Sequence, residues 1–87
     1  MSPLKDLRIK YGKTTSRQAI NAAIRAELPG GPGVLDLMEL THHAAERLGW
    51  EDPDGKPSLL RVIHEQLCAA ANAMEAEIRR RYGMPPM

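Results

Sequence analysis

Side chains able to recognise a nucleic-acid duplex gather between residues 10 and 25. Arg17, Gln18 and Asn21 stand near the start of a predicted helix. Arginine pairs with guanine, and glutamine or asparagine with adenine, through two hydrogen bonds each. Basic and hydroxyl side chains suit backbone phosphates. The residues expected to contact double-stranded DNA are therefore Lys10, Lys13, Thr15, Ser16, Arg17, Gln18, Asn21 and Arg25.

Two short helices joined by a tight turn would position these side chains. Ser2-Pro3 is a favourable helix start and Gly12 a favourable stop, which predicts a helix over residues 3–11. Thr15 and Gln18 fit a capping box that opens a second helix over residues 15–28. Helices joined by a short turn containing glycine have the outline of a helix-turn-helix, whose second helix enters the major groove.

The segment from Arg17 to Ala26, RQAINAAIRA, resembles the recognition helix of Cro-type repressors of temperate phages, which share its Ala-Ile-Asn-x-Ala-Ile-x-Ala pattern. The resemblance implies that Gln18 and Asn21 contact bases or backbone, and that Ile20 and Ile24 enter the core. It covers ten residues of 87. The helix that precedes this motif in the family, and the strands that follow it, find no counterpart in this chain.

The remaining sequence predicts two longer helices, over residues 34–48 and 58–82. The Pro29–Gly33 segment, with two prolines and three glycines, should end the second helix and supply a hinge. The last helix is long enough to be the spine of the molecule, with Leu67 at the centre of its apolar stripe. Its predicted stripe is Leu60, Ile63, Leu67, Ala71, Met74 and Ile78. We therefore expect one all-α domain over residues 1–87, a compact bundle of four helices.

Charge is segregated along the chain although the net charge is +1. Residues 1–26 hold six basic side chains and one acidic one, residues 27–78 hold ten acidic and three basic ones, and Arg79–Arg81 follow. This asymmetry indicates a basic end that meets an anion, or that meets an acidic surface of a second copy in a homodimer.

Metal and catalytic chemistry are disfavoured by the residue pattern. His64 and Cys68 are four residues apart on one predicted helix, but the chain has one cysteine and no common zinc spacing. No third group that would orient a Cys–His pair is evident in the sequence. We expect no enzyme activity, no cofactor and no metal. The absence of a long apolar run or a signal-peptide pattern leads us to expect a cytoplasmic protein without membrane association.

Two classes of function follow from these patterns. The first is a helix-turn-helix-like, DNA-binding transcription regulator of phage or mobile-element type. The second is an adaptor or inhibitor that presents a helical face to a partner protein, with Met38, Trp50 and Met84 as the expected apolar anchors.

Overall fold

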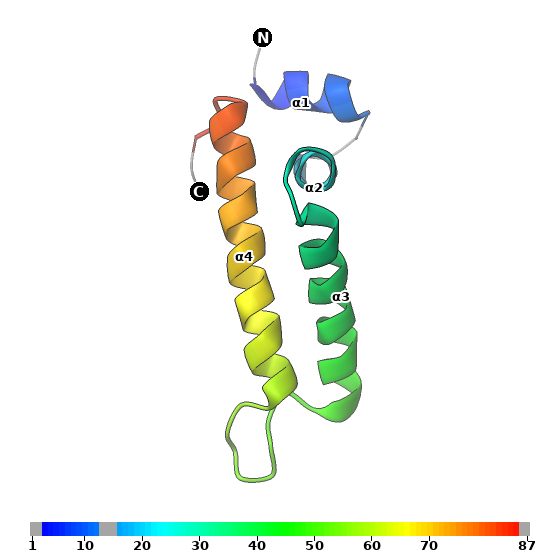
Figure 1. Ribbon diagram of the computed structural model, residues 1–87, viewed down its shortest axis with the longest axis vertical. Helices are drawn as coiled ribbons and strands as arrows, with labels where there is room; N and C mark the ends of the chain where they lie inside the picture. The colour runs from blue at the N-terminus through cyan, green and yellow to red at the C-terminus, as the bar shows by residue number, and fades with distance from the viewer. Residues whose placement is uncertain (1–2, 13–15, 86–87) are drawn as a thin grey trace.

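The computed structural model describes residues 3–12 and 16–85, and these residues form the predicted all-α fold. The four helices are α1 (Pro3–Tyr11), α2 (Ser16–Glu27), α3 (Gly31–Leu48) and α4 (Leu59–Arg81) (Figure 1). Within the described residues β-pairing is limited to one isolated antiparallel bridge between Glu51 and Pro57. The prediction of four helices with a long C-terminal helix is confirmed.

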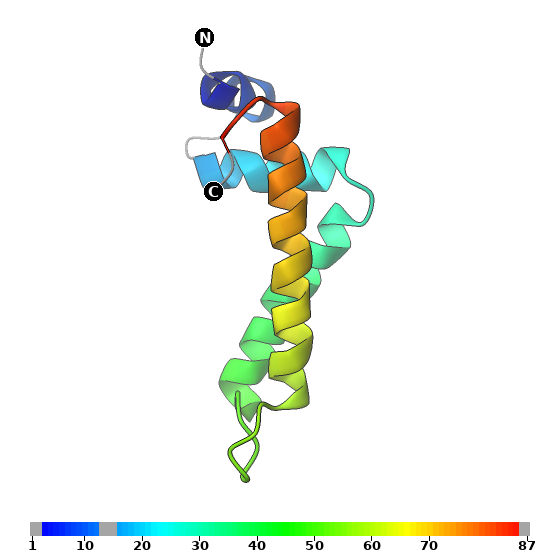
Figure 2. The same cartoon turned by 90° about the vertical axis from the view of Figure 1, so that its left-hand side faces the viewer.

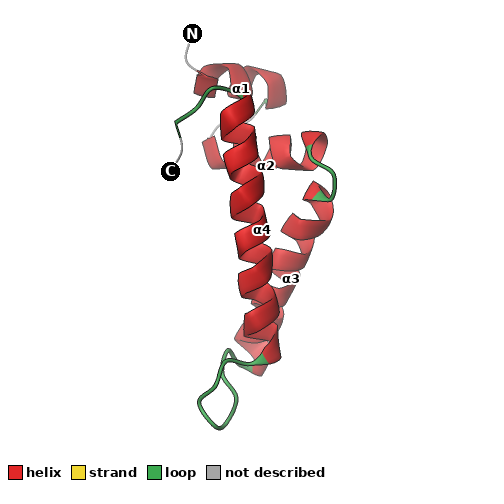
Figure 3. Ribbon diagram, turned by 60° about the vertical axis from the view of Figure 1, so that its left-hand side comes forward, coloured by secondary structure: helices red, strands yellow, loops and turns green. Residues whose placement is uncertain are grey.

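The helices form an elongated molecule of 53 × 21 × 21 Å. α3 and α4 run antiparallel as a long hairpin, and α2 lies across one end of it beneath α1 (Figures 1 and 2). We call the end with α1, α2 and the last turns of α4 the head. The opposite end, which we call the tip, holds the loop between α3 and α4 (Figure 3).

The hydrophobic core lies in the head. α2 buries one complete face there, because its isoleucines and alanines recur at helical spacing. α1 contributes Leu7, α3 contributes Leu35 and α4 contributes Ile78. The fully packed cluster is Leu7, Ala19, Ile20, Ala23, Ile24, Leu35 and Ile78. The head is therefore a layered globular unit, whereas the hairpin beyond it consists of two helices only.

The junction between α2 and α3 differs from the predicted hinge. α3 begins at Gly31, three residues earlier than expected, with Pro32 in its first turn, where a missing N–H costs no hydrogen bond. Gly30 supplies the turn with φ of 76°. A Cβ on Gly31 would lie 2.1 Å from the carbonyl oxygen of Ile24. The glycines thus allow a close crossing of two helices, and the loop itself is short.

Both ends of α4 follow their sequence signals. The Ser58 hydroxyl accepts a hydrogen bond from the Arg61 amide and donates one to the Gly49 carbonyl, so this N-cap also fastens α4 to the end of α3. Gly83 has φ of 67°, and the Met84 amide donates to the Arg79 carbonyl at 2.7 Å, which closes α4 at Arg81, one residue before the predicted end.

The apolar stripe of α4 is buried unevenly. Ile78 is fully buried and Met74 packs against the core, but Leu67 is half-buried and Ile63 is 38% exposed. The core is therefore not centred on Leu67, the middle residue of the predicted stripe. The core is centred nearer the C-terminal end of α4, because α2 crosses the hairpin there and supplies the third layer.

Candidate functional site

The apolar half of the proposed recognition helix is placed as expected, since Ile20 and Ile24 are each 1% exposed. Its charged residues are engaged within the molecule. Arg17 pairs with Glu75 of α4, and Arg25 pairs with Asp36 of α3 at 2.7 Å. α2 therefore lies against the hairpin with both arginines bound to neighbouring carboxylates.

The other residues of the predicted DNA-contacting set are dispersed over the head. Gln18 is exposed, whereas Ser16 and Asn21 are half-buried. Lys10 is exposed at the end of α1, 3.9 Å from a Glu27 carboxylate oxygen. Lys13 and Thr15 lie outside the described residues. The structure thus brings Arg17, Asn21 and Arg25 onto the side of α2 that meets α3 and α4.

Glu75 is the electrostatic centre of the head. Its side chain is 5% exposed and accepts hydrogen bonds from both Arg17 and Arg79. Burial opposes ionisation, but the two guanidinium groups outweigh it and hold the pKa of Glu75 below its ordinary value. Because Arg17 belongs to α2 and Arg79 to α4, this carboxylate ties two helices together.

Other acidic residues neutralise most of the basic charge in the head. Hydrogen bonds from Arg80 and Arg81 lower the pKa of Glu77 to about 2. Tyr82 donates its hydroxyl proton to Glu27 at 2.7 Å, and burial together with this bond raises the pKa of Tyr82 to about 12. The basic segments at the two ends of the sequence therefore meet in the head, but many of their charges are internally paired.

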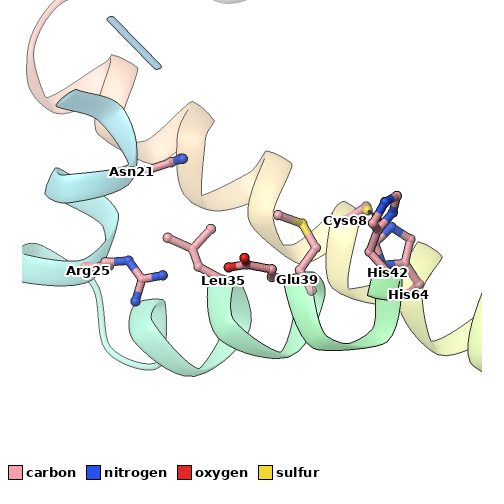
Figure 4. A pocket seen from close by; sticks show the side chains of 8 residues that line it. Asn21, Arg25, Leu35, Glu39, His42, His64 and Cys68 are labelled. Carbon is pink, nitrogen blue, oxygen red and sulfur yellow. Dashed lines mark hydrogen bonds between the residues drawn. The ribbon is translucent and has the colours of Figure 1, made fainter. Parts of the chain in front are cut away.

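A hollow of about 410 Å³ opens where α2 meets the side of the hairpin (Figure 4). We call it the side hollow. Its lining combines apolar side chains with amide, guanidinium, carboxylate, imidazole and thiol groups from α2, α3 and α4. These residues are Asn21, Arg25, Leu35, Met38, Glu39, His42, His64 and Cys68.

His64 is held on the wall of this hollow by two hydrogen bonds. The Thr41 hydroxyl lies 2.8 Å from the Leu37 carbonyl oxygen, to which it donates, and 3.0 Å from Nδ1 of His64. On the other side of the ring, the Cys68 thiol lies 3.4 Å from Nε2. Residue spacing could not indicate Thr41 as an orienting group, because Thr41 lies 23 residues from His64 on another helix.

The two other histidines do not complete a metal site with this pair. The His42 ring lies beside that of His64, with centroids 5.6 Å apart and the ring planes tilted by 48°. In the part of the chain that is described, no three His, Cys, Asp or Glu side chains are grouped so that they could bind a metal ion.

The predicted protein-binding anchors are all partly buried. Met38 and Met84 pack against the core. Trp50 packs against the rings of His42 and His64, and its indole N–H donates to Glu46 at 3.2 Å. The large apolar side chains that are most exposed lie elsewhere on the molecule.

An exposed apolar surface lies along the hairpin. On α3, Leu48 is 79% exposed, and on α4, Leu59 is 72% exposed. Together with their neighbours at helical spacing they form what we call the apolar face. Its large side chains are Leu37, Leu40 and Leu48 of α3 and Leu59, Val62 and Ile63 of α4.

The two stripes of the apolar face lie on one side of the hairpin, opposite the side hollow. Successive residues of a helix are rotated by about 100°, so Leu37 lies about 160° around α3 from Glu39. On α4, Ile63 lies about 140° from Cys68 by the same rule. Since Glu39 and Cys68 both line the side hollow, the exposed leucines and isoleucine project from the opposite side.

Comparison with known proteins identifies no family model, no curated protein and no solved structure that matches this chain. Within residues 3–12 and 16–85, none of the helices has the length and apolar character needed to span a bilayer.

Proposed function

We propose that this protein is a non-enzymatic protein-binding module whose contact surface is the apolar face of the α3–α4 hairpin. The observation that supports the proposal is the exposure of six large aliphatic side chains on one side of two adjacent helices. Scattered exposed leucines are ordinary, but a contiguous apolar patch on a small soluble domain marks an interaction site.

The architecture explains why a partner is needed there. A helical domain becomes stable by packing at least two layers around one core, and the head meets this requirement. Beyond the head, α3 and α4 form a single layer, and no other helix of the described chain covers their exposed side. A helical partner could pack its ridges into the grooves of this layer.

Site-specific photo-crosslinking in cells would test the proposal. A photoreactive amino acid in place of Leu40 should crosslink to one protein species in good yield. The matched control replaces Glu65, an exposed residue of α4 on the side of the hollow, and should give none. Equal crosslinking at both positions, or none at either, would contradict the proposal.

DNA binding by the head is a second candidate, supported by the meeting of the N-terminal basic segment and Arg79–Arg81 at one end of the molecule (Figure 1). In this proposal Lys10 and Lys13 contact phosphates. Gln18 would contact bases from the exposed surface of α2. Before contacting DNA, Arg17 would have to break its ion pair with Glu75, and Arg25 its ion pair with Asp36. Asn21 would have to turn out of the side hollow.

Fluorescence anisotropy with random duplex DNA would test the second candidate at two salt concentrations. Affinity should fall with salt, with a log–log slope of about −0.9 per neutralised phosphate. Lys10→Ala and Lys13→Ala should each reduce this slope by about one unit, whereas Lys56→Ala in the tip loop should not change it. Lack of binding at low salt would remove the candidate.

A further inference from the structure

We infer that the apolar face is covered by a second copy of this chain, packed antiparallel so that each head lies beside the partner's tip. This inference rests on the proposed function and names the partner. The two hairpins would form a four-helix bundle related by a two-fold axis, the commonest symmetry of soluble oligomers.

The exposed area of the chain is what such a dimer requires. The accessible surface is 5783 Å² for a mass of 9.6 kDa. A compact monomer of this mass would expose about 5,100 Å². The excess of about 700 Å² is close to the roughly 800 Å² that each partner buries in a standard protein interface.

The centre of the apolar face is also uncharged, as a bundle interior must be. The α3 stripe from Leu37 to Leu48 continues through Leu40 and Ala44, with His43 and Arg47 beside it at its outer edge. The α4 stripe has Gln66 as its polar member among apolar residues. Its members are Leu59, Val62, Ile63, Gln66, Ala69, Ala70 and Ala73.

The distribution of side-chain size favours the antiparallel arrangement. The bulky members of the α4 stripe, from Leu59 to Ile63, lie near the tip, whereas Ala69, Ala70 and Ala73 lie toward the head. When two copies run antiparallel, the bulky part of each stripe meets the small residues of the other. The distance between the hairpins can then stay uniform, because interaxial spacing depends on side-chain size.

Charge complementarity selects the same arrangement. The tip loop holds exposed Glu51, Asp52 and Asp54 against Lys56. In the head, α1 holds exposed Lys5, Arg8 and Lys10 against Asp6. An antiparallel dimer places each acidic tip beside a basic head. A parallel dimer would instead place like charges together, which is unfavourable.

Sedimentation velocity of the full chain from 1 to 200 µM tests the stoichiometry. The wild-type protein should sediment as a dimer, at twice 9.6 kDa. Leu40→Glu and Leu48→Glu should each shift it to a monomer with unchanged far-UV helicity, because both side chains are exposed in the single chain. The control Asn72→Glu adds the same charge at an exposed position lining the opposite side and should remain dimeric.

Crosslinking tests the orientation. In a Cys68→Ala background, Asp54→Cys protein is mixed with Arg8→Cys protein and treated with a short bis-maleimide. The mixed product, which joins position 54 to position 8, should exceed the 54–54 product at least tenfold. A predominant 54–54 product would overturn the antiparallel arrangement.

Two results would overturn the second copy as the partner. One is a wild-type monomer at 200 µM with native helicity. The other is a dimer that persists in both Leu40→Glu and Leu48→Glu. A monomer whose position 40 crosslinks to a different protein in cells would reject this inference and retain the proposed function, whereas a monomer that forms no crosslink would reject both.

Discussion

Glu75 shows at the residue scale how one side chain fixes two elements. The bond from Arg79, at 2.9 Å, joins residues four apart on one helix, a spacing that sequence alone reveals. The bond from Arg17 spans 58 residues of sequence, so no local pattern could indicate it. Arg17, which we predicted to contact DNA, thus joins α2 to α4 in this structure.

The lowered pKa of Glu75 predicts acid sensitivity. The unfolded state binds its proton more readily than the folded state does, so this stabilisation is complete above the ordinary pKa of about 4.3 and is lost as pH falls through the folded-state value. Glu75→Gln should cost about 1–3 kcal/mol at pH 7, because two guanidinium groups lose a charged acceptor.

Urea unfolding from pH 7 to pH 2 would measure this effect. The gap between wild type and Glu75→Gln should narrow as the pH falls below about 4. Glu39→Gln is the control, since this exposed carboxylate lies 3.7 Å from His43 on the same helix. A constant gap across the whole range would show that the ionised carboxylate contributes nothing to stability.

Alanine substitution at Gly31 and at Gly33, two residues apart in α3, should change the stability of the fold in opposite directions. Gly31→Ala would force a Cβ against the Ile24 carbonyl, so it should destabilise the fold by about 2–4 kcal/mol. Gly33→Ala has open space in the first turns of α3 and should be neutral or stabilising by up to about 1 kcal/mol. Thermal unfolding of both variants measures the difference, and equal midpoints would contradict the close crossing.

At the scale of elements, periodicity and capping predicted the helices well. Residues 3–11 match α1 at both ends, and Ser58, Gly49 and Gly83 mark helix boundaries through their ordinary cap roles. The start of α3 was missed because a Pro-Gly segment is read as loop, although proline is favourable in a first turn.

Periodicity could not show which part of each stripe is covered. On α3, Leu37 and Leu48 share one apolar stripe at helical spacing with Met38, yet Met38 packs against the core and the two leucines are exposed. Burial depends on where α2 crosses the hairpin, and that crossing is set by contacts between distant residues. The side hollow could not be predicted either, because its residues come from three helices that only the tertiary fold brings together.

The position of the core predicts unequal costs for two truncations on α4. Ile78→Ala should destabilise the protein by about 2–5 kcal/mol, because the residue is fully buried in the head. Leu67→Ala should cost about 1 kcal/mol in the monomer, because this side chain is half-buried. Denaturant titration would measure the free energy of unfolding of each variant in a monomeric Leu40→Glu background. A larger loss of stability for Leu67→Ala than for Ile78→Ala would contradict the placement of the core in the head.

At the scale of the whole molecule, the head and the hairpin have different chemical characters. The head contains a packed core and a network of ion pairs that joins α2, α4 and the C-terminal turn. The hairpin beyond it consists of two helices packed on each other, with exposed aliphatic side chains along one side. The protein therefore combines a packed head with an extension whose exposed side is suited to association.

The placement of the core at one end also determines how the molecule opens. Backbone amides exchange with deuterium according to the free energy of local opening, which is lowest where few apolar contacts would be broken. In the monomer, amides of α3 and α4 near the 49–58 loop should exchange first, and those around Ile20, Ile24 and Ile78 last. Docking on the apolar face would slow exchange of the amides near the loop and leave those of the core unchanged, so exchange rates near the loop would report occupancy of this face.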